Sequence, residues 1–274
     1  MIHNIEIYKE KIIRKINPKT AQIITRIEES GIDDEEKIAV FDLDGTLIEG
    51  DIGDAIFCFL ISSGYSFDFK WSNYQDMLAV KNYRNAYIDI VTTMKGMDVK
   101  TIVWAASALL KSNSNYFDFE EDGIKYSMQI PKPIPEMQYL LTYLKLSKWK
   151  ISVISASSHI AVRTVCDILF KLKPDYIRGI KTELEVSDEY IDLFTDRISG
   201  TVTYREGKAV NFRELFGNDA KPIITAGDSH GDIELLNLTP DNGLVLICSK
   251  TPEDIDFLRN NLNTKAAYVI TGDY

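Results

Sequence analysis

The stretch KIAVFDLDGTLIEGD, residues 37–51, decides the fold class of this chain. Its apolar run IAVF is short and rich in β-branched and aromatic residues, which predicts a buried strand. Asp42 and Asp44 follow the strand at once, and Gly45 bends the chain behind them. Carboxylates brought together at the end of a buried strand repel each other unless a cation or a shared proton compensates. The stretch therefore indicates a chemical site at the edge of a sheet.

The second half of the chain alternates apolar strands with amphipathic helices. The predicted strands are KISVIS (150–155), PIITAG (222–227) and GLVLIC (243–248), and helices are predicted at 136–147, 159–172, 208–217 and 232–238. This order predicts an α/β fold, a Rossmann-like doubly wound parallel sheet covered by helices on both faces. Ligands bind beyond the carboxyl ends of such strands, so Asp42, Ser155 and Asp228 are expected at one edge.

Composition shifts divide the chain into three predicted regions. Residues 1–31 form an N-terminal helical extension, in which Asn17 caps a helix that starts at Pro18. Residues 32–51 and 131–274 are expected to form the α/β core, with a hairpin within 176–205. Aromatic-rich segments with helical spacing from 52 to 130 predict an inserted, mostly helical cap domain.

Charge and hydropathy exclude several classes of function. The 274 residues carry a formal net charge of -10 with no basic patch, which argues against nucleic-acid binding. No run is apolar and long enough to cross a membrane, and the N-terminus mixes charges through its apolar runs. The cysteines Cys58, Cys166 and Cys248 lack metal-ligand spacing and are expected to be buried in a cytoplasmic protein. The sequence carries no signal for the oligomeric state.

The acidic residues at the predicted sheet edge suit magnesium and phosphoryl chemistry. A few carboxyl and carbonyl oxygens, completed by water and phosphate, are the ligands that Mg²⁺ prefers, so Asp42 and Asp228 are candidate ligands. One carboxylate can attack phosphorus while a second transfers a proton to the departing oxygen. Asp42 and Asp44 are the candidates for this pair.

Four motifs in order resemble those of the haloacid dehalogenase-like hydrolase superfamily, most of whose members are magnesium-dependent phosphatases. The motifs are DLDGT (42–46), VISAS (153–157), EGK (206–208) and GDSHGD (227–232). The chain is most similar to the phosphoserine-phosphatase-like branch, in which a helical cap follows the first motif and a β-hairpin precedes the lysine. The resemblance covers about residues 36–250.

The resemblance implies a role for each matching residue. Asp42 would be the nucleophile that becomes an aspartyl-phosphate, and Asp44 would be the general acid and base. Magnesium would bind Asp42, Asp228 and the backbone carbonyl of Asp44. Lys208 would neutralise charge on the phosphoryl group and on Asp42. Asp232 would orient either Lys208 or a water molecule bound to the metal. The remaining implied contacts to the substrate phosphate come from Thr46, Ser155, Lys208 and the amide of Ala156.

The sequence does not identify the leaving group of the substrate, because several residues that could contact it have two interpretations. Asp51 is either a substrate contact or the N-cap of the following helix. Arg84 is either a carboxylate ligand, as in phosphoserine phosphatases, or an exposed arginine. The segment SASSHI (155–160) departs from the branch by its added Ser158 and His159, which affects substrate contacts more than phosphate chemistry. The aromatic residues are either a cage for a quaternary ammonium or the core of the cap: Tyr65, Phe67, Phe69, Trp71 and Tyr74.

The combined prediction is a magnesium-dependent phosphatase that hydrolyses a small phosphorylated metabolite through an aspartyl-phosphate. Three alternatives use the same scaffold. One is a phosphotransferase or mutase, the second is a phosphocholine-type phosphatase, and the third is a noncatalytic phosphate-binding protein. Haloacid dehalogenation itself is disfavoured, because those enzymes lack the second aspartate that Asp44 supplies.

Overall fold

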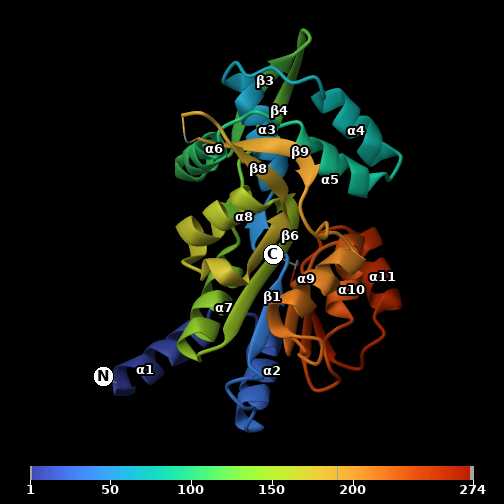
Figure 1. Cartoon of the computed structure of the whole chain (residues 1–274). Coiled ribbons are helices and arrows are strands. Elements are labelled where there is room, and N and C mark those ends of the chain that lie inside the picture. The colour runs from blue at the N-terminus through green and yellow to red at the C-terminus, as the bar shows by residue number, and fades with distance from the viewer. Residues whose placement is uncertain (1, 190, 272–274) are drawn as a thin grey trace. The chain divides into compact units, whose positions relative to one another are not determined.

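The computed structural model describes residues 2–189 and 191–271 of the chain (Figure 1). Two compact units are present. The first comprises Met1–Glu49, Pro133–Ile154 and Arg205–Tyr274, and the second comprises Gly50–Lys132 and Ser155–Tyr204. Residues 155–204 thus lie in the second unit, although the sequence pattern grouped them with the core. The functional domain scheme stays a prediction.

A central sheet of six strands has the order β12-β11-β10-β1-β6-β7. Its strands are β1 (Ile38–Phe41), β6 (Lys150–Ser158), β7 (Ile177–Ile180), β10 (Ile224–Gly227), β11 (Leu244–Ile247) and β12 (Ala267–Ile270). β1 pairs in parallel with both β6 and β10, and the pairs β10–β11 and β11–β12 are also parallel. All residues of β1, β10 and β11 are buried, as expected of a sheet covered on both faces. The predicted α/β fold class is therefore confirmed.

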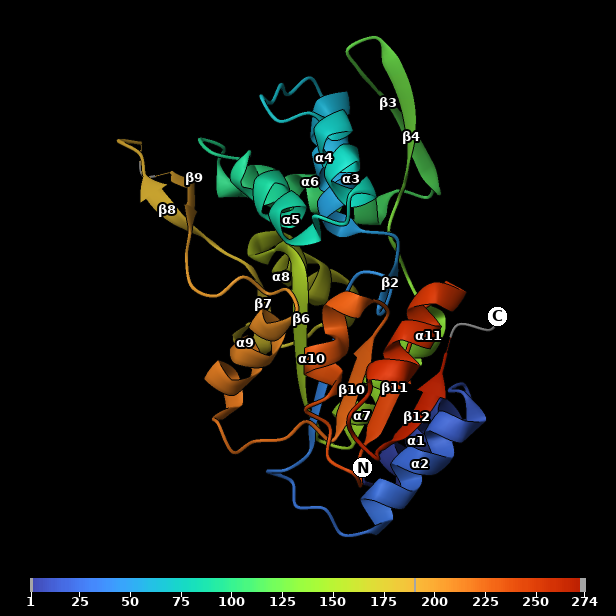
Figure 2. The same ribbon diagram turned by 90° about the vertical axis from the view of Figure 1, so that its right-hand side faces the viewer.

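Helices of the first unit cover both faces of its strands, with α10 and α11 in front of β10 and β11 and α7 behind them in Figure 2. The helices are α1 (Ile2–Ile13), α2 (Pro18–Glu29), α7 (Pro135–Leu146), α9 (Glu206–Phe216), the 3₁₀ turn η3 (His230–Asp232), α10 (Ile233–Leu236) and α11 (Pro252–Asn261). On one face Ile38 and Val40 of β1 pack in a cluster with Phe212 of α9 and Leu235 of α10. This packing places the start of α9 beside the strands that carry the acidic motifs.

The N-terminal helix α2 starts as the sequence predicts. The Asn17 side chain accepts hydrogen bonds from the amides of Lys19 and Thr20, and Pro18 is the first helical residue. The Asn17 amide also donates to Glu136 Oε1 of α7 at 2.7 Å. This contact fixes the N-terminal helices to the first unit.

The second unit contains the helices α3 (Ile52–Ser62), α4 (Trp71–Ala79), α5 (Tyr83–Thr92), α6 (Val99–Lys111) and α8 (His159–Val165), followed by the π-helical turn η1 (Cys166–Phe170) and the 3₁₀ turn η2 (Pro174–Tyr176). Two antiparallel hairpins complete it: β3 (Tyr116–Glu121) with β4 (Ile124–Gln129), and β8 (Thr182–Val186) with β9 (Asp192–Ile198). The short strands β2 (Ile48–Glu49) and β5 (Lys132–Pro133) pair where the chain passes between the units.

The hairpin β3–β4 was not foreseen within the mostly helical region 52–130. Asp122 and Gly123 form its two-residue turn, and both have positive φ, at 51° and 81°. An Asp-Gly pair between two short strands is a typical hairpin signal. The sequence contains this Asp-Gly signal, but the helical spacing of apolar residues elsewhere in 52–130 favoured a helical interpretation of the whole region.

The aromatic residues of the second unit form its core, which was one of the two interpretations. Trp71 and Tyr74 are 4% and 1% exposed, and their rings stack with centroids 5.3 Å apart. Phe67 and Phe69 pack against the same core cluster. Tyr65 is exposed, so these five residues do not enclose a common cage.

The three cysteines are buried, as the sequence predicts, and none of them is in a disulfide bond. Across the part of the chain that the structure describes, no helix combines the length and apolar character needed to cross a membrane.

Candidate active site

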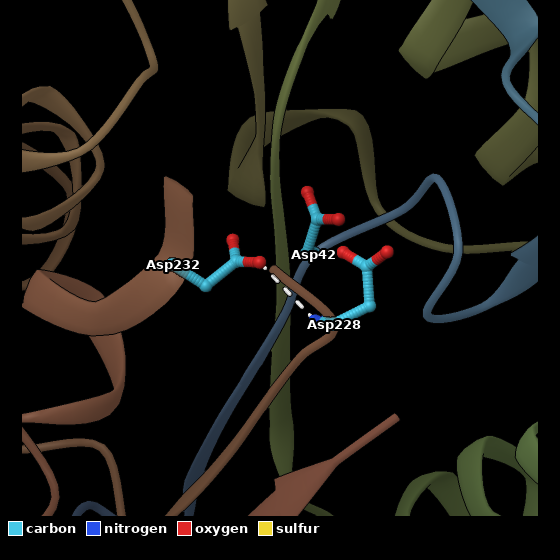
Figure 3. A group of neighbouring side chains, drawn as sticks. All are labelled: Asp42, Asp228 and Asp232. Atoms are coloured by element: carbon cyan, nitrogen blue, oxygen red, sulfur yellow. Dashed lines mark hydrogen bonds between the residues drawn. The ribbon is translucent and has the colours of Figure 1, made fainter. Parts of the chain in front are cut away.

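Asp42 and Asp228 lie at the carboxyl ends of neighbouring strands in the first unit. The Asp42 amide donates to the Ala226 carbonyl at 2.9 Å, which extends the ladder between β1 and β10 by one residue. Asp228 follows β10 directly, and Asp232 lies one short turn later. Oxygen atoms of these three carboxylates lie within 4.8 Å of one another. Figure 3 shows the three side chains gathered around a shared space.

Lys208 lies between two of these carboxylates. Its Nζ donates to Asp42 Oδ1 at 2.6 Å and to Asp232 Oδ1 at 2.5 Å. Asp42, Lys208 and Asp232 are 5%, 3% and 0% exposed, so the ion pairs are shielded from water. Burial alone would lower the pKa of Lys208, but Asp232 and Asp42 outweigh it and raise the pKa. The lysine is therefore a fixed positive charge beside Asp42.

Asp232 uses both carboxylate oxygens to organise the site. Its Oδ2 accepts hydrogen bonds from the amides of Asp228 and Ser229, at 3.2 and 3.1 Å. The first of these bonds is the dashed line in Figure 3. Since Oδ1 accepts from Lys208, Asp232 acts as a positioning residue for the lysine and the turn. Asp42 and Asp228 are consequently the better metal ligands of the three.

Burial and neighbouring negative charges raise the pKa of the carboxyl groups of Asp42 and Asp228. Burial raises the pKa of Asp42 to about 8, with Asp232 and Asp44 adding to the shift and Lys208 opposing it. Burial also raises the pKa of Asp228 well above its usual range, and the charges of Asp232 and Asp42 contribute. Such carboxyls take up either protons or a hard cation. The donor set thus fits Mg²⁺, because it offers oxygen atoms alone and a surplus of negative charge.

Two glycines make room for this cluster. Gly45 has a φ of +72°, and a Cβ built on it would lie 2.7 Å from Asp228 Cγ. A Cβ on Gly227 would lie 2.5 Å from Asp232 Cβ. Both distances are shorter than real Cβ contacts, so only glycine fits at either position.

The turn after Asp42 holds two further predicted residues. The amides of Leu47 and Ile48 donate to the Leu43 carbonyl at 2.8 and 3.1 Å, which wraps the chain into a tight turn. Asp44 lies partly exposed on this turn, near enough for its charge to raise the pKa of Asp42. Thr46 is fully buried, and its Oγ1 has no hydrogen-bond partner among the described protein atoms. A buried hydroxyl of this kind is suited to a ligand.

The other predicted contacts belong to the second unit. Ser155 is fully buried, its Oγ accepts the Ser157 amide at 3.0 Å, and its carbonyl accepts the Thr203 hydroxyl. Asp51 caps α3, because its Oδ1 accepts the Asp54 amide at 2.9 Å. Arg84 is exposed on α5. Within the first unit, Val153 of β6 pairs with Phe41 of β1, the residue before Asp42.

Sequence reasoning missed the residues that tie Lys208 to the acidic turn. Arg205, directly before α9, has a φ of +50°, and its amide donates to the Gly231 carbonyl at 3.1 Å. Its guanidinium donates to Glu234 Oε1 at 2.8 Å. A positive φ in a residue other than glycine is unusual and often marks a functional site. No local pattern announces this link, because it joins two segments distant in sequence.

Comparison with known proteins places the chain in a family. The family model described as haloacid dehalogenase-like hydrolase matches residues 39–237. A search of curated protein sequences found no match. Similar solved structures include a functionally unknown protein from Anaerococcus prevotii DSM 20548, at 17% identity and a TM-score of 0.60, covering 86% of each chain. A protein of unknown function from Bordetella pertussis Tohama I is 16% identical with a TM-score of 0.59, covering 85% of this chain and 97% of its own.

A substrate-bound phosphoserine phosphatase complex is also similar, with 18% identity and a TM-score of 0.53, covering 84% of this chain and 91% of its own. At such identities the similarity concerns the fold, which is that of the predicted branch. The family match spans most of the chain and includes the segments that carry Asp42, Lys208 and Asp228. The protein therefore belongs to the haloacid dehalogenase-like hydrolase family.

Proposed function

We propose that this protein is a magnesium-dependent phosphatase that hydrolyses a small phosphomonoester through an aspartyl-phosphate on Asp42. The observation that carries the proposal is the position of Lys208, whose Nζ donates hydrogen bonds to both Asp42 and Asp232. These two buried carboxylates form a cluster with the partly exposed Asp228. A carboxylate held by a lysine is oriented for attack, and the positive charge stabilises the negative charge that the reaction gathers there.

In the first step, an oxygen of Asp42 forms a bond to phosphorus while the bond from phosphorus to the leaving oxygen breaks. Asp44, as the carboxylic acid, donates its proton to that oxygen, and an alcohol departs. Lys208 opposes the protonation of Asp42 and neutralises part of the phosphoryl charge. Asp44 suits the acid role because it lies on the same turn as Asp42 but is more exposed.

In the second step, the carboxylate of Asp44 takes a proton from a water molecule, whose oxygen forms a bond to phosphorus. The bond between phosphorus and Asp42 breaks, which releases inorganic phosphate and restores the free carboxylate. The same group thus acts first as an acid and then as a base. Asp232 holds Lys208 in place throughout, because its hydrogen bonds do not involve the reacting atoms.

Asp42, Asp228 and the backbone carbonyl of Asp44 would hold Mg²⁺. When bound, the ion supplies Lewis-acid stabilisation of the phosphoryl oxygens. The surplus of negative charge that raises the pKa of Asp42 and Asp228 supports this assignment.

Ser155, the amide of Ala156 and Thr46 are proposed to bind the substrate phosphate. The unpartnered hydroxyl of buried Thr46 supports its part in this set. The last residues of β6, after Ser155, lead directly into α8, whose start offers further backbone amides.

The test is hydrolysis of p-nitrophenyl phosphate with and without Mg²⁺, together with mass spectrometry of acid-quenched protein to detect the phosphoenzyme. We expect Mg²⁺-dependent release of phosphate and a phosphate adduct on the peptide that contains Asp42. Asp42→Asn should abolish both, whereas the exposed Asp219→Asn is the matched control and should retain both. Transfer of phosphate to an added alcohol in place of release would identify a phosphotransferase. Unchanged turnover in Asp42→Asn would reject the proposal.

A further inference from the structure

The second unit contains a small cavity next to the end of β6, the strand that carries Ser155. Its polar lining comes from Asp51 and Asp54 at the start of α3, Tyr74 of α4, and Ser157 and Ser158 at the end of β6. The rest of the wall comes from Gly53, Ala156 and four residues of α5 and the loop after it, which are Tyr87, Ile90, Val91 and Met94. The cavity volume is about 10 Å³, which is room for one group the size of a water molecule.

Ser158 lines this cavity and carries a hydroxyl for which the described protein atoms supply no hydrogen-bond partner. The residue is 2% exposed, and its Oγ has no hydrogen-bond partner among the described protein atoms. Ser158 is the N-cap residue of α8, yet its side chain does not accept a backbone amide as serine usually does there. Buried polar atoms are nearly always paired, so this hydroxyl points to a ligand group that supplies the partner.

The charged residues that line the cavity determine the sign of the charge on a ligand group that can bind there. Asp51 and Asp54 both line it, and the Tyr74 hydroxyl hydrogen-bonds Asp54. Among the described residues of the lining, none is a lysine or an arginine. Arg84, the candidate carboxylate ligand, lies exposed on α5 and is not part of the lining. The cavity therefore attracts a cation and repels a carboxylate.

The volume of the cavity limits which cationic group can fit inside it. A primary ammonium is about as large as water and has three donors, which the Ser158 hydroxyl and the two carboxylates can accept. A trimethylammonium group is several times larger than the cavity.

The cavity adjoins residues that the proposed function assigns to phosphate binding. Ala156 lines it, and its amide is one of the proposed phosphate ligands. A phosphomonoester held at Ser155 and Ala156 would thus have its leaving group at the cavity. The following inference rests on the proposed function.

We propose that this cavity selects phosphomonoesters of a short alcohol that ends in a primary ammonium and carries no carboxylate. Asp51, Asp54 and Ser158 are the specificity-determining residues. The substrate class thus differs from the phosphorylated amino acid on which the phosphoserine phosphatases act, because the described lining offers no positive charge for a carboxylate.

A matched substrate series tests this selection. We expect kcat/KM for 2-aminoethyl phosphate to exceed that for 2-hydroxyethyl phosphate by about 10-fold or more, the usual gain from a charged hydrogen bond. Phosphocholine, which is too large, and O-phosphoserine, which adds a carboxylate, should both be poorer than 2-aminoethyl phosphate. A ratio of 1 or less between the aminoethyl and hydroxyethyl esters would overturn the inference.

Ser158→Ala separates recognition from folding. Removing an unpaired buried hydroxyl should leave the melting temperature unchanged or raise it, because no protein hydrogen bond is lost. The same substitution should lower the aminoethyl-to-hydroxyethyl ratio of kcat/KM about 10-fold. Asp54→Asn should lower this ratio as well, and Asp76→Asn, an exposed change on α4, is the matched control that should preserve it. A structural role for Ser158 would instead change stability and leave the ratio intact.

The two proposals fail in different ways. Hydrolysis of p-nitrophenyl phosphate that requires Asp42 would support the phosphatase activity. If kcat/KM for 2-aminoethyl phosphate then does not exceed that for 2-hydroxyethyl phosphate, the proposed selection for an amine is rejected while the phosphatase activity is retained. If no ester is hydrolysed in an Asp42-dependent manner, the proposed function itself falls. In that case, binding of 2-aminoethyl phosphate measured by calorimetry in the wild type and Ser158→Ala still tests the cavity, and equal affinities would reject its role.

Discussion

The backbone of Gly45 lies directly against the carboxylate of Asp228. A Cβ on Gly45 would approach Asp228 Cγ to 2.7 Å, and the φ of +72° is one that other residues rarely adopt. The residue that bends the chain after the first acidic motif is thus also the residue that allows the second acidic motif to approach. Two motifs more than 180 positions apart in sequence share one steric requirement.

Gly45→Ala should therefore displace Asp228 and weaken magnesium binding. We expect about a 100-fold loss of metal affinity or activity, as is typical when a neighbour of a metal ligand is disturbed. Gly31→Ala is the matched control: its φ is +77°, but no atom lies within 4 Å of the added Cβ. Both variants should lose about 1–3 kcal/mol of stability from backbone strain. Calorimetric titration with Mg²⁺ measures the difference, and equal affinities in the two variants would contradict the steric argument.

Asp232→Asn should reduce kcat more than it changes KM. The amide side chain can still accept the Asp228 and Ser229 amides, but it no longer supplies a charge to Lys208. Lys208 would then be held by Asp42 alone, and we expect kcat to fall about 10- to 100-fold. Lys208→Met removes the cation altogether and should cost about 3–5 kcal/mol, since two buried carboxylates lose their partner. Steady-state kinetics and urea unfolding check both, and a normal kcat in Asp232→Asn would exclude its positioning role.

Magnesium should stabilise the protein more at high pH than at low pH. The pKa of Asp42 is raised to about 8, so the metal-free folded state holds a proton that the unfolded chain has already released. This contribution to stability is present at low pH and is lost as the pH rises through about 8. Because Mg²⁺ replaces the proton, its effect on the melting temperature should be larger at about pH 8.5 than at about pH 6. The same shift at both values would show that protons and metal do not compete at this site.

His159 should make the protein sensitive to acid. Burial, reinforced by the charges of Lys181, Arg163 and Arg178, lowers the pKa of His159 to about 3. The unfolded chain takes up a proton near pH 6.5 while the folded state does not, so stability is lost as the pH falls below that value. Between about pH 7 and pH 5 the loss should be about 2 kcal/mol, which His159→Gln should largely remove. Urea unfolding of both proteins at the two pH values measures this, and parallel losses would refute it.

Much of the site could be predicted because its chemistry is carried by local patterns. The apolar run before Asp42 predicts a buried strand, and the similar run before Asp228 predicts a second one. Parallel strands bring their carboxyl ends to one edge, so the proximity of these two carboxylates follows from strand patterns alone. The N-cap at Asn17 is likewise a local matter, decided by one side chain and the proline after it.

Other features depend on contacts that no local pattern records. The sequence left two interpretations for the aromatic residues near Trp71, and only packing against Phe57 and Tyr74 assigns them to a core. The link from Arg205 to Glu234 and the unpaired hydroxyl of Ser158 also became visible only in three dimensions. The sequence shows which polar groups the chain contains. Their hydrogen-bond partners depend on which distant segments come into contact in the folded structure.

The amino-acid sequence by itself determined the α/β class, the order of the motifs and the identity of the carboxylates at the strand ends, because strand periodicity and turn chemistry act over a few residues. The tertiary structure alone decided that Lys208 is shared by Asp42 and Asp232, that Gly45 makes room for Asp228, and that the cavity beside Ser158 is small and lined by acids. Those features arise from close packing between segments far apart along the chain, and packing is a property of the folded whole.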